Sequence, residues 1–275
     1  MLENIAKELR RDIILAAYRG KTGHLASAFS SVEIMTVLYF ADILQYDLSD
    51  SNWEERDKLI VSKGHASLVL YSVLKRLGYI TQEQLNTYCQ PGSSLGGEPM
   101  YGEIPGVEAS TGSLGHGLSF AVGVAMASAM DKKKNRIYVL LGDGECQEGS
   151  IWEAALSAAQ NKLGNLTVIL DRNQLQAMGK TEEILSLSPL ADKWESFGWS
   201  VKEVDGHNIS ELQEVLKKDK MMDLEQPRLI IAHTIKGKGV SFMENVPIWH
   251  YRMPNDEEME IVKRELNISE KELRS

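Results

Sequence analysis

The stretch LLGDGECQEG, residues 140–149, decides the fold. An apolar run, IYVLL, leads into it, and such a run is typical of a strand that is buried on both faces of a parallel sheet. The run stops at Gly142-Asp143-Gly144, and a helical pattern follows from about Glu148. Gly-Asp-Gly is also an ordinary turn and can signal a hairpin, but the helical pattern after it argues against a hairpin. A strand, a glycine-rich turn and a helix in this order predict an α/β unit.

The same alternation runs through the rest of the chain. β-rich runs occupy residues 58–62, 136–142, 166–171, 199–204 and 228–234. Helical periodicity occupies residues 2–18, 32–44, 66–77, 115–130, 148–163, 189–197 and 210–218. We therefore expect an α/β fold with a mostly parallel central sheet and helices on both faces. We expect one domain over residues 1–275, with a short polar helical tail at about 255–275.

Composition and charge exclude several classes of protein. Apolar residues make up 43% of the chain and charged residues 25%, as in an ordinary globular protein. The net charge of −9 leaves no broad basic face for nucleic acid. The chain has no uncharged apolar run of about eighteen residues, so we expect no membrane span. The two cysteines, Cys89 and Cys146, argue for a reducing compartment, and we predict a cytoplasmic protein.

Glycine-rich or polar residues follow four of the predicted strands. These strand ends are at residues 63–65, 142–144, 171–173 and 236–239. In open α/β sheets, ligands bind beyond the carboxyl ends of the strands, so we expect a binding site there. The segment 90–113 is too long for a simple connection, which is often a sign of a functional loop.

The chemistry of these strand ends suits a metal and a diphosphate. Asp143 and Asn173 offer hard oxygen ligands, which magnesium and calcium prefer. Gly144 lets a phosphate oxygen approach the backbone, and the helix that follows can face an anion with its amides. Lys236 and Lys238 are either solvated turn residues or contacts for an anion. The residues therefore predict that Asp143 links a divalent metal to a bound diphosphate.

The stretch 142–175 resembles the thiamine diphosphate motif, in which Gly-Asp-Gly is followed after 28 residues by Asn. In its details it is most similar to the transketolase family. Three other stretches agree, namely GKTGHLASAFSSVEI (20–34), LIVSKGHASLVLYSVL (59–74) and PGVEASTGSLGHGLSFAVGVAMA (105–127). The resemblance covers nearly the whole chain. It implies a thiamine-diphosphate-binding fold, with thiamine diphosphate and Mg²⁺ (or Ca²⁺) as cofactors.

The resemblance also implies cofactor-binding residues. The metal ligands of the family fall on Asp143, Asn173 and the backbone carbonyl of Leu175, and its diphosphate contacts fall on Gly144 and His65. A backbone segment that lies against the cofactor falls on Gly112, Ser113, Leu114 and Gly115. An acidic residue that couples the two active sites across the dimer falls on Glu148.

Two further histidines are implied as catalytic. His24 matches a family histidine that points into the substrate channel, and His250 matches one that enters the site late in the chain. A single histidine in a chain with six is more often structural, but His24 and His65 both follow a glycine at a loop that enters a helix. His250 is followed by Tyr251, where the family usually has glycine.

The chain departs from a full transketolase in its length. It ends near the close of the first cofactor-binding domain, so it resembles the amino-terminal subunit of a split transketolase. The resemblance implies transfer of a two-carbon ketol unit from a ketose to an aldose. It also implies a carboxy-terminal partner that supplies the activating glutamate, in a dimer of heterodimers.

The second departure is Glu98, which stands where the family commonly has the histidine of Gly-His-Pro. An ionised carboxylate accepts hydrogen bonds but cannot donate them, whereas imidazole does both. We therefore hypothesise that Glu98 marks a different donor, such as a branched or sulfonated sugar.

Three other functions are alternatives. The α subunits of 2-oxo-acid dehydrogenases share Gly-Asp-Gly but lack the paired Gly-His turns and the STGSLGHG loop. A non-catalytic, cofactor-binding regulatory subunit is disfavoured by the intact candidate site. A dinucleotide site fails, because GSLGHG lacks the Gly-x-Gly-x-x-Gly order and a strand directly before it.

Overall fold

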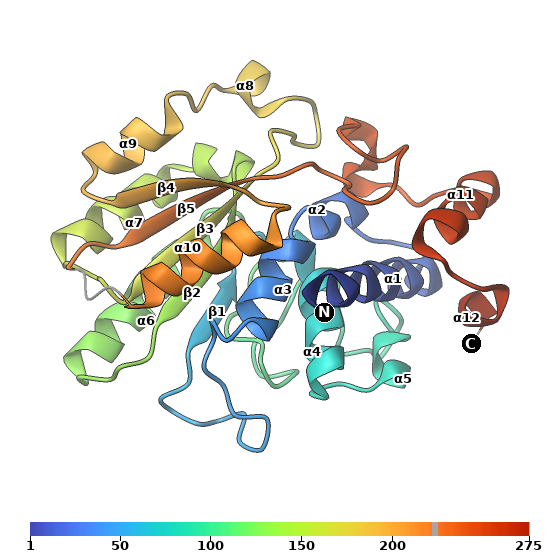
Figure 1. The fold of residues 1–275 in the computed structure, drawn as a ribbon, viewed down its shortest axis with the longest axis horizontal. Helices are drawn as coiled ribbons and strands as arrows, with labels where there is room; N and C mark the ends of the chain where they lie inside the picture. The colour runs from blue at the N-terminus through green and yellow to red at the C-terminus, as the bar shows by residue number, and fades with distance from the viewer. Residues whose placement is uncertain (222–224, 275) are drawn as a thin grey trace.

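A five-stranded sheet forms the centre of the molecule. The computed structural model describes residues 1–221 and 225–274. Its strands are β1 (Lys58–Val61), β2 (Ile137–Gly142), β3 (Leu166–Arg172), β4 (Ser200–Asp205) and β5 (Arg228–His233). Their order is β1-β2-β3-β5-β4, and every neighbouring pair is parallel (Figure 1). The predicted α/β class and parallel sheet are confirmed.

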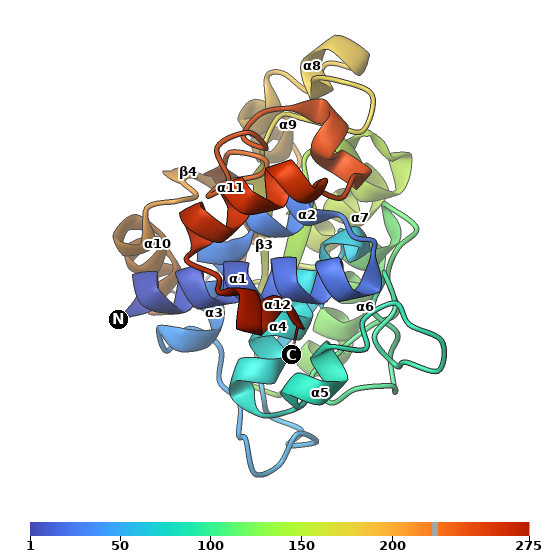
Figure 2. The same cartoon turned by 90° about the vertical axis from the view of Figure 1, so that its right-hand side faces the viewer.

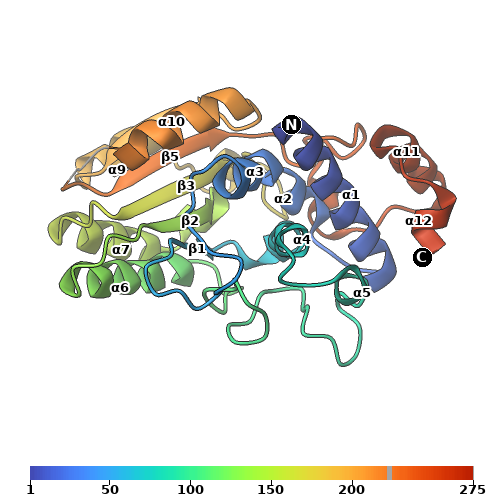
Figure 3. The same cartoon turned by 60° about the horizontal axis from the view of Figure 1, so that its bottom comes forward.

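Helices cover both faces of this sheet (Figure 3). The helices on one side are α1 (Leu2–Gly20), α3 (Val32–Phe40), α4 (Ser67–Leu77) and α10 (Ile209–Met221). Those on the other side are α6 (His116–Met130), α7 (Gly149–Gln160) and α9 (Leu190–Ser196). Side chains alternate between the two cores along β2, since Tyr138 and Leu140 face the first group and Val139 and Leu141 the second.

The short helices were not predicted. They are α2 (Leu25–Phe29), α5 (Gln82–Leu85), α8 (Thr181–Ile184) and the 3-10 turns η1 (Gly64–Ala66), η2 (Gly144–Gln147) and η3 (Pro247–Tyr251). Elements of three to five residues are too short to show a helical period. The helix expected over 32–44 ends at Phe40.

The tail forms α11 (Asp256–Leu266) and α12 (Glu270–Arg274), which lie against α1 (Figure 2). A reciprocal capping box between Asn255 and Glu258 starts α11, and Met259 and Val262 join the core. In the part of the chain that the structure describes, the helices lack the length and apolar character needed to cross a bilayer.

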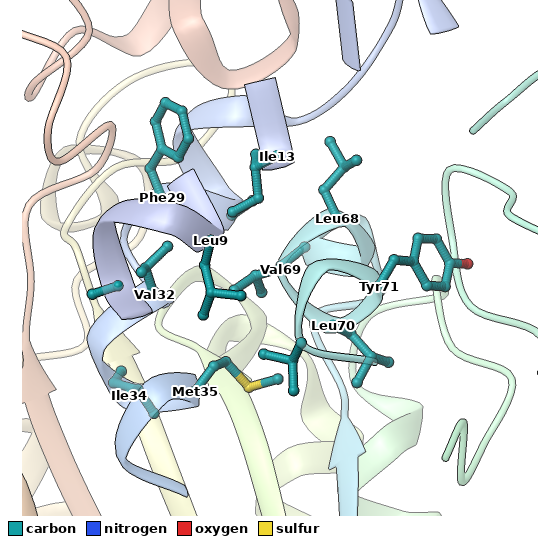
Figure 4. Close-up of a cluster of buried hydrophobic side chains, with 14 of the residues drawn as sticks. Leu9, Ile13, Phe29, Val32, Ile34, Met35, Leu68, Val69, Leu70 and Tyr71 are labelled. Carbon is teal, nitrogen blue, oxygen red and sulfur yellow. The ribbon is translucent and has the colours of Figure 1, made fainter. Parts of the chain in front are cut away.

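An apolar cluster joins α1, α2, α3 and α4 on the first side of the sheet (Figure 4). Leu9, Ile13, Phe29 and Leu68 are fully buried in it. These helices carry the loops that lead to His24 and His65, so their packing fixes one wall of the site described next.

Candidate active site

The ends of β2 and β3 bring the predicted metal ligands together. Gly142 pairs with Asp171 at the last position of the β2–β3 register, and the next amide, that of Asp143, donates to the Asp171 carbonyl at 3.3 Å. A cavity of about 220 Å³ opens beyond these ends. Eight predicted site residues line it: His65, Leu114, Asp143, Gly144, Glu148, Asn173, Leu175 and His250.

Asp143 is a buried carboxylate held by backbone amides. Its Oδ1 accepts from the Gly144 amide at 2.8 Å, and its Oδ2 accepts from the Gln174 amide at 2.6 Å. Burial, and then the negative charge of Asp171, raise the pKa of Asp143 to about 6. A divalent cation favours the ionised form, so this carboxylate suits a metal ligand. Together with the Asn173 side chain and the Leu175 carbonyl it makes an all-oxygen set.

A buried ion pair lies behind the site and was missed from the sequence. Lys63, which follows β1, pairs with Asp171 at the end of β3, and both side chains are buried. Asp171 also accepts from Ser30 Oγ at 2.6 Å and Ser31 Oγ at 2.9 Å. Burial pushes the pKa of Asp171 upward, but the Lys63 charge and these hydrogen bonds outweigh it and hold the pKa at about 2. Lys63 and Asp171 are 108 positions apart in the sequence, and they meet because β1 and β3 lie in the same sheet.

Lys236 is buried in the site, so the solvated-turn alternative is wrong for this residue. Its Nζ donates to the Leu175 carbonyl at 2.9 Å and to His250 Nδ1 at 2.8 Å. Burial, and then the charge of Lys63, lower the pKa of Lys236 to about 8. Lys238 is half-buried, and its Nζ lies 3.5 Å from Glu244.

The three predicted histidines meet in one cluster. The ring centroid of His24 lies 5.3 Å from that of His65 and 5.2 Å from that of His250, and the centroids of His65 and His250 lie 5.5 Å apart. Burial, and then the charge of Lys236, lower the pKa of His24 to about 4 and that of His250 to about 3. Burial also lowers the pKa of His65 well below its usual value. All three are therefore neutral at pH 7, and each ring has one donor and one acceptor.

The segment from Gly112 to Gly115 packs against the histidine turn. A β-carbon on Gly64 would lie 2.7 Å from the Gly112 amide nitrogen, so this approach requires glycine. Leu114 lines the cavity, whereas Ser113 is exposed. Gly115 has a φ of 89° and is the N-cap of α6.

Glu145 organises this segment and was also missed. One of its carboxylate oxygens accepts from the Gly115 amide at 2.9 Å and from Ser62 Oγ at 2.5 Å, and the other accepts from the Gly142 amide at 3.2 Å. It thus joins the ends of β1 and β2 to the start of α6. Its place directly after Gly-Asp-Gly is the signal that could have found it. The neighbouring Glu148 is exposed at the N-cap of α7.

Glu98 lies outside the cavity lining, but it reaches the predicted cofactor segment. A β-carbon on Gly112 would lie 2.3 Å from the Glu98 Oε2, so the carboxyl group sits directly on that glycine. The Tyr71 hydroxyl donates to the Glu98 carbonyl at 3.3 Å, and Ser67 Oγ donates to the Gly97 carbonyl at 2.7 Å. Glu98 itself is exposed.

The fold and the site define an α/β protein with a parallel sheet and a polar cavity at its strand ends. The family model described as "Transketolase, thiamine diphosphate binding domain" matches residues 2–273, and the chain belongs to this family. It is 42% identical to a subunit of the apulose-4-phosphate transketolase of Phocaeicola vulgatus, over 97% of this chain and 94% of that protein. It is also 42% identical to the 6-deoxy-6-sulfo-D-fructose transketolase subunit SqwG of a Clostridium species, over 81% of this chain and 80% of that protein.

Solved transketolase structures have the same fold as this chain. The transketolase from Leishmania mexicana superposes with a TM-score of 0.91 at 26% identity, covering 100% of this chain and 43% of that one. The transketolase from Campylobacter jejuni gives a TM-score of 0.88 at 29% identity, covering 98% and 45%. The chain thus spans less than half of these full-length enzymes. The family, its thiamine-diphosphate-binding fold and the transferase class predicted from the sequence are confirmed.

Proposed function

We propose that this chain is the amino-terminal subunit of a two-chain transketolase that moves a two-carbon ketol unit from a ketose to an aldose. The observation that carries the proposal is the meeting of Asp143, Asn173 and the Leu175 carbonyl in one cavity with His65 and His250. This set combines ligands for a hard cation with neutral imidazoles that can bind hydroxyls.

The residues fit thiamine diphosphate and a divalent metal. Asp143, Asn173 and the Leu175 carbonyl would hold Mg²⁺ (or Ca²⁺), because a buried carboxylate with a raised pKa gains a charge partner there. Gly144 and His65 would contact the diphosphate.

The backbone from Gly112 through Ser113 and Leu114 to Gly115 would lie against the rest of the cofactor. Glu148, exposed beside the cavity, would couple this site to a second one across the dimer.

Thiamine diphosphate, when bound, supplies the carbon nucleophile that cleavage of a ketose requires. The chain's own contribution is binding and proton handling. His24 and His250 would hold or exchange protons with sugar hydroxyls, since both rings are neutral over the physiological pH range. Lys236 keeps the His250 ring in place through its hydrogen bond to Nδ1.

A partner chain would complete the site. The two relatives described above carry names that identify them as subunits of transketolases. Large apolar side chains are exposed within two residues of the cavity lining: Met178 is 89% exposed, Ile248 62% and Tyr251 63%. We propose that a carboxy-terminal transketolase chain covers them, supplies the activating glutamate and forms a dimer of heterodimers. The cytoplasmic location remains the prediction made from the cysteines.

The donor is proposed to be a ketose that carries an anionic group, either a phosphate or a sulfonate. Relatives of this chain are named for apulose-4-phosphate and for 6-deoxy-6-sulfo-D-fructose. The position of Glu98 on Gly112 supports its role as a specificity residue, because a carboxylate there favours donors that offer hydroxyl groups.

A reconstituted donor-cleavage assay tests this function. The chain is mixed with its candidate partner, thiamine diphosphate and Mg²⁺, and the donors include apulose-4-phosphate, 6-deoxy-6-sulfo-D-fructose and xylulose-5-phosphate. We expect turnover in the mixture only, with neither chain active alone. Partner activity that survives Asp143→Ala in this chain would instead identify a regulatory role.

A further inference from the structure

The side-chain amide of Gln176 lines the cavity but has no role in the site described above. Gln176 lines the cavity, and its Nε2 is buried with no hydrogen-bond partner among residues 1–221 and 225–274. Buried donors in folded proteins are nearly always paired, so an unpaired amide in a ligand cavity points to a partner that comes from outside the chain.

Two acceptor groups that line the same cavity as Gln176 already serve other donors. Both carboxylate oxygens of Asp143 accept from backbone amides, those of Gly144 and Gln174. The Leu175 carbonyl accepts from Lys236. The side-chain amide of Gln176 is therefore an unused donor in a cavity whose other groups suit an anion and its metal.

The position of the side chain is fixed by its surroundings. The backbone amide of Gln176 donates to the Gly179 carbonyl at 2.8 Å, and the backbone amide of Thr181 donates to the Gln174 carbonyl at 2.9 Å. These backbone hydrogen bonds close the turn. The Gln176 side chain folds onto Gly144, where an added β-carbon would lie 2.9 Å from Cγ and 3.3 Å from Nε2. Gly144 is thus needed to seat Gln176, as well as to expose its own backbone.

We propose that Gln176 is a further diphosphate-binding residue, whose Nε2 donates a hydrogen bond to an anionic oxygen of the cofactor. This inference rests on the proposed function and extends its binding set to the turn after Leu175. It makes Gln176 a partner of Gly144: the two residues, on separate strand ends, contact each other and form one side of the anion site.

Calorimetric titration tests the proposal with inorganic pyrophosphate and thiamine diphosphate, each with Mg²⁺, on the chain together with its partner. Gln176→Leu keeps the packing on Gly144 and removes the donor, and we expect both ligands to bind about 10-fold more weakly. Gln176→Glu places a negative charge beside the anion, and we expect a loss of about 100-fold. Gln160→Leu, on the exposed end of α7, is the matched control and should bind as the wild type does.

The outcomes separate this proposal from the proposed function. If wild type binds neither ligand, the proposed function fails and this inference fails with it. If wild type binds both and Gln176→Leu binds both equally well, only the inference is overturned. If Gln176→Leu weakens thiamine diphosphate but not pyrophosphate, the residue acts elsewhere on the cofactor and the proposal is also overturned. Equal thermal melting of the unliganded variants excludes a folding defect as the cause.

Discussion

The apolar cluster of α1 to α4 and the cavity at the strand ends are both buried, but they are stabilised in opposite ways. Leu9 and its neighbours in Figure 4 stabilise the fold through the burial of their apolar side chains. At the cavity, Asp143 has a raised pKa, Lys236 a lowered one, and Gln176 an unpaired amide. The cluster is complete without a ligand, whereas the cavity holds groups that the proposed cofactor and metal would pair. The unliganded chain therefore gains stability at the apolar cluster and loses it at the cavity.

The Lys63–Asp171 pair links the two regions, since Lys63 lines the cavity and Asp171 accepts hydrogen bonds from Ser30 and Ser31 between α2 and α3. Lys63→Met leaves the fully buried Asp171 carboxylate without its cation. We expect the free energy of unfolding to fall by about 4 kcal/mol, measured by urea denaturation at pH 7. Lys63→Met combined with Asp171→Leu should recover much of that loss. If the single variant is as stable as wild type, the pair is not a structural element.

The apolar cluster should affect stability without affecting binding. Leu9→Ala removes a fully buried side chain and should lower the free energy of unfolding by about 3 kcal/mol. Because Leu9 lies away from the cavity lining, the dissociation constant for thiamine diphosphate should stay within about twofold of wild type below the melting temperature. A large rise in that constant for a folded Leu9→Ala chain would show that the two regions are coupled.

A second buried network supports the turn that carries Lys236. Glu33 accepts from Arg10 at 2.7 Å and from His207 at 2.9 Å, Arg10 also donates to the Lys238 carbonyl, and His207 accepts from the Ile235 amide. Burial raises the pKa of Glu33, but the His207 and Arg10 contacts prevail and lower it to about 2.

A depressed carboxylate pKa contributes stability that is present above the unfolded pKa and lost as the pH falls through the folded one. Glu33→Gln should therefore cost about 2 kcal/mol at pH 7, and less as the pH falls from about 4.5 toward 2. Urea denaturation at several pH values measures this. A cost that is constant with pH would exclude the ionised Glu33 as its source.

The smallest expected effect concerns specificity. Glu98 is exposed, so Glu98→His should leave the melting temperature unchanged. We expect the ratio of kcat/KM between two ketose donors to shift several-fold, because histidine donates a hydrogen bond that a carboxylate cannot. Tyr101→His, another exposed position in the same loop, is the control. An unchanged donor ratio would remove Glu98 from the specificity residues.

The sequence predicted the sheet because apolar runs are a local feature, and together with the family resemblance it named eight of the residues that line the cavity. The apolar runs before 142–144 and 171–173 each end beside a proposed metal ligand, and a parallel sheet aligns such ends. The contacts of Lys63 with Asp171, of Glu145 with Gly115 and of Lys236 with Leu175 were not predictable, since each joins residues 30 or more positions apart. The unpaired side-chain amide of Gln176 was not predictable either, because a missing hydrogen bond is recognised only when the positions of all neighbouring atoms are known.

Asp143 gives the most direct test of the contrast between binding and stability. Its raised pKa means that the folded chain binds a proton there more tightly than the unfolded chain. The stability from that proton is therefore lost as the pH rises from 3.8 to about 6, and the full cost of the ionised form is present at pH 7.5. The measurement is the melting temperature of Asp143→Asn at pH 7.5, with and without Mg²⁺ and thiamine diphosphate, in the presence of the partner. We predict that Mg²⁺ and thiamine diphosphate raise the melting temperature of wild type and do not raise that of Asp143→Asn. A cofactor-induced rise in the variant equal to that of wild type would contradict the account.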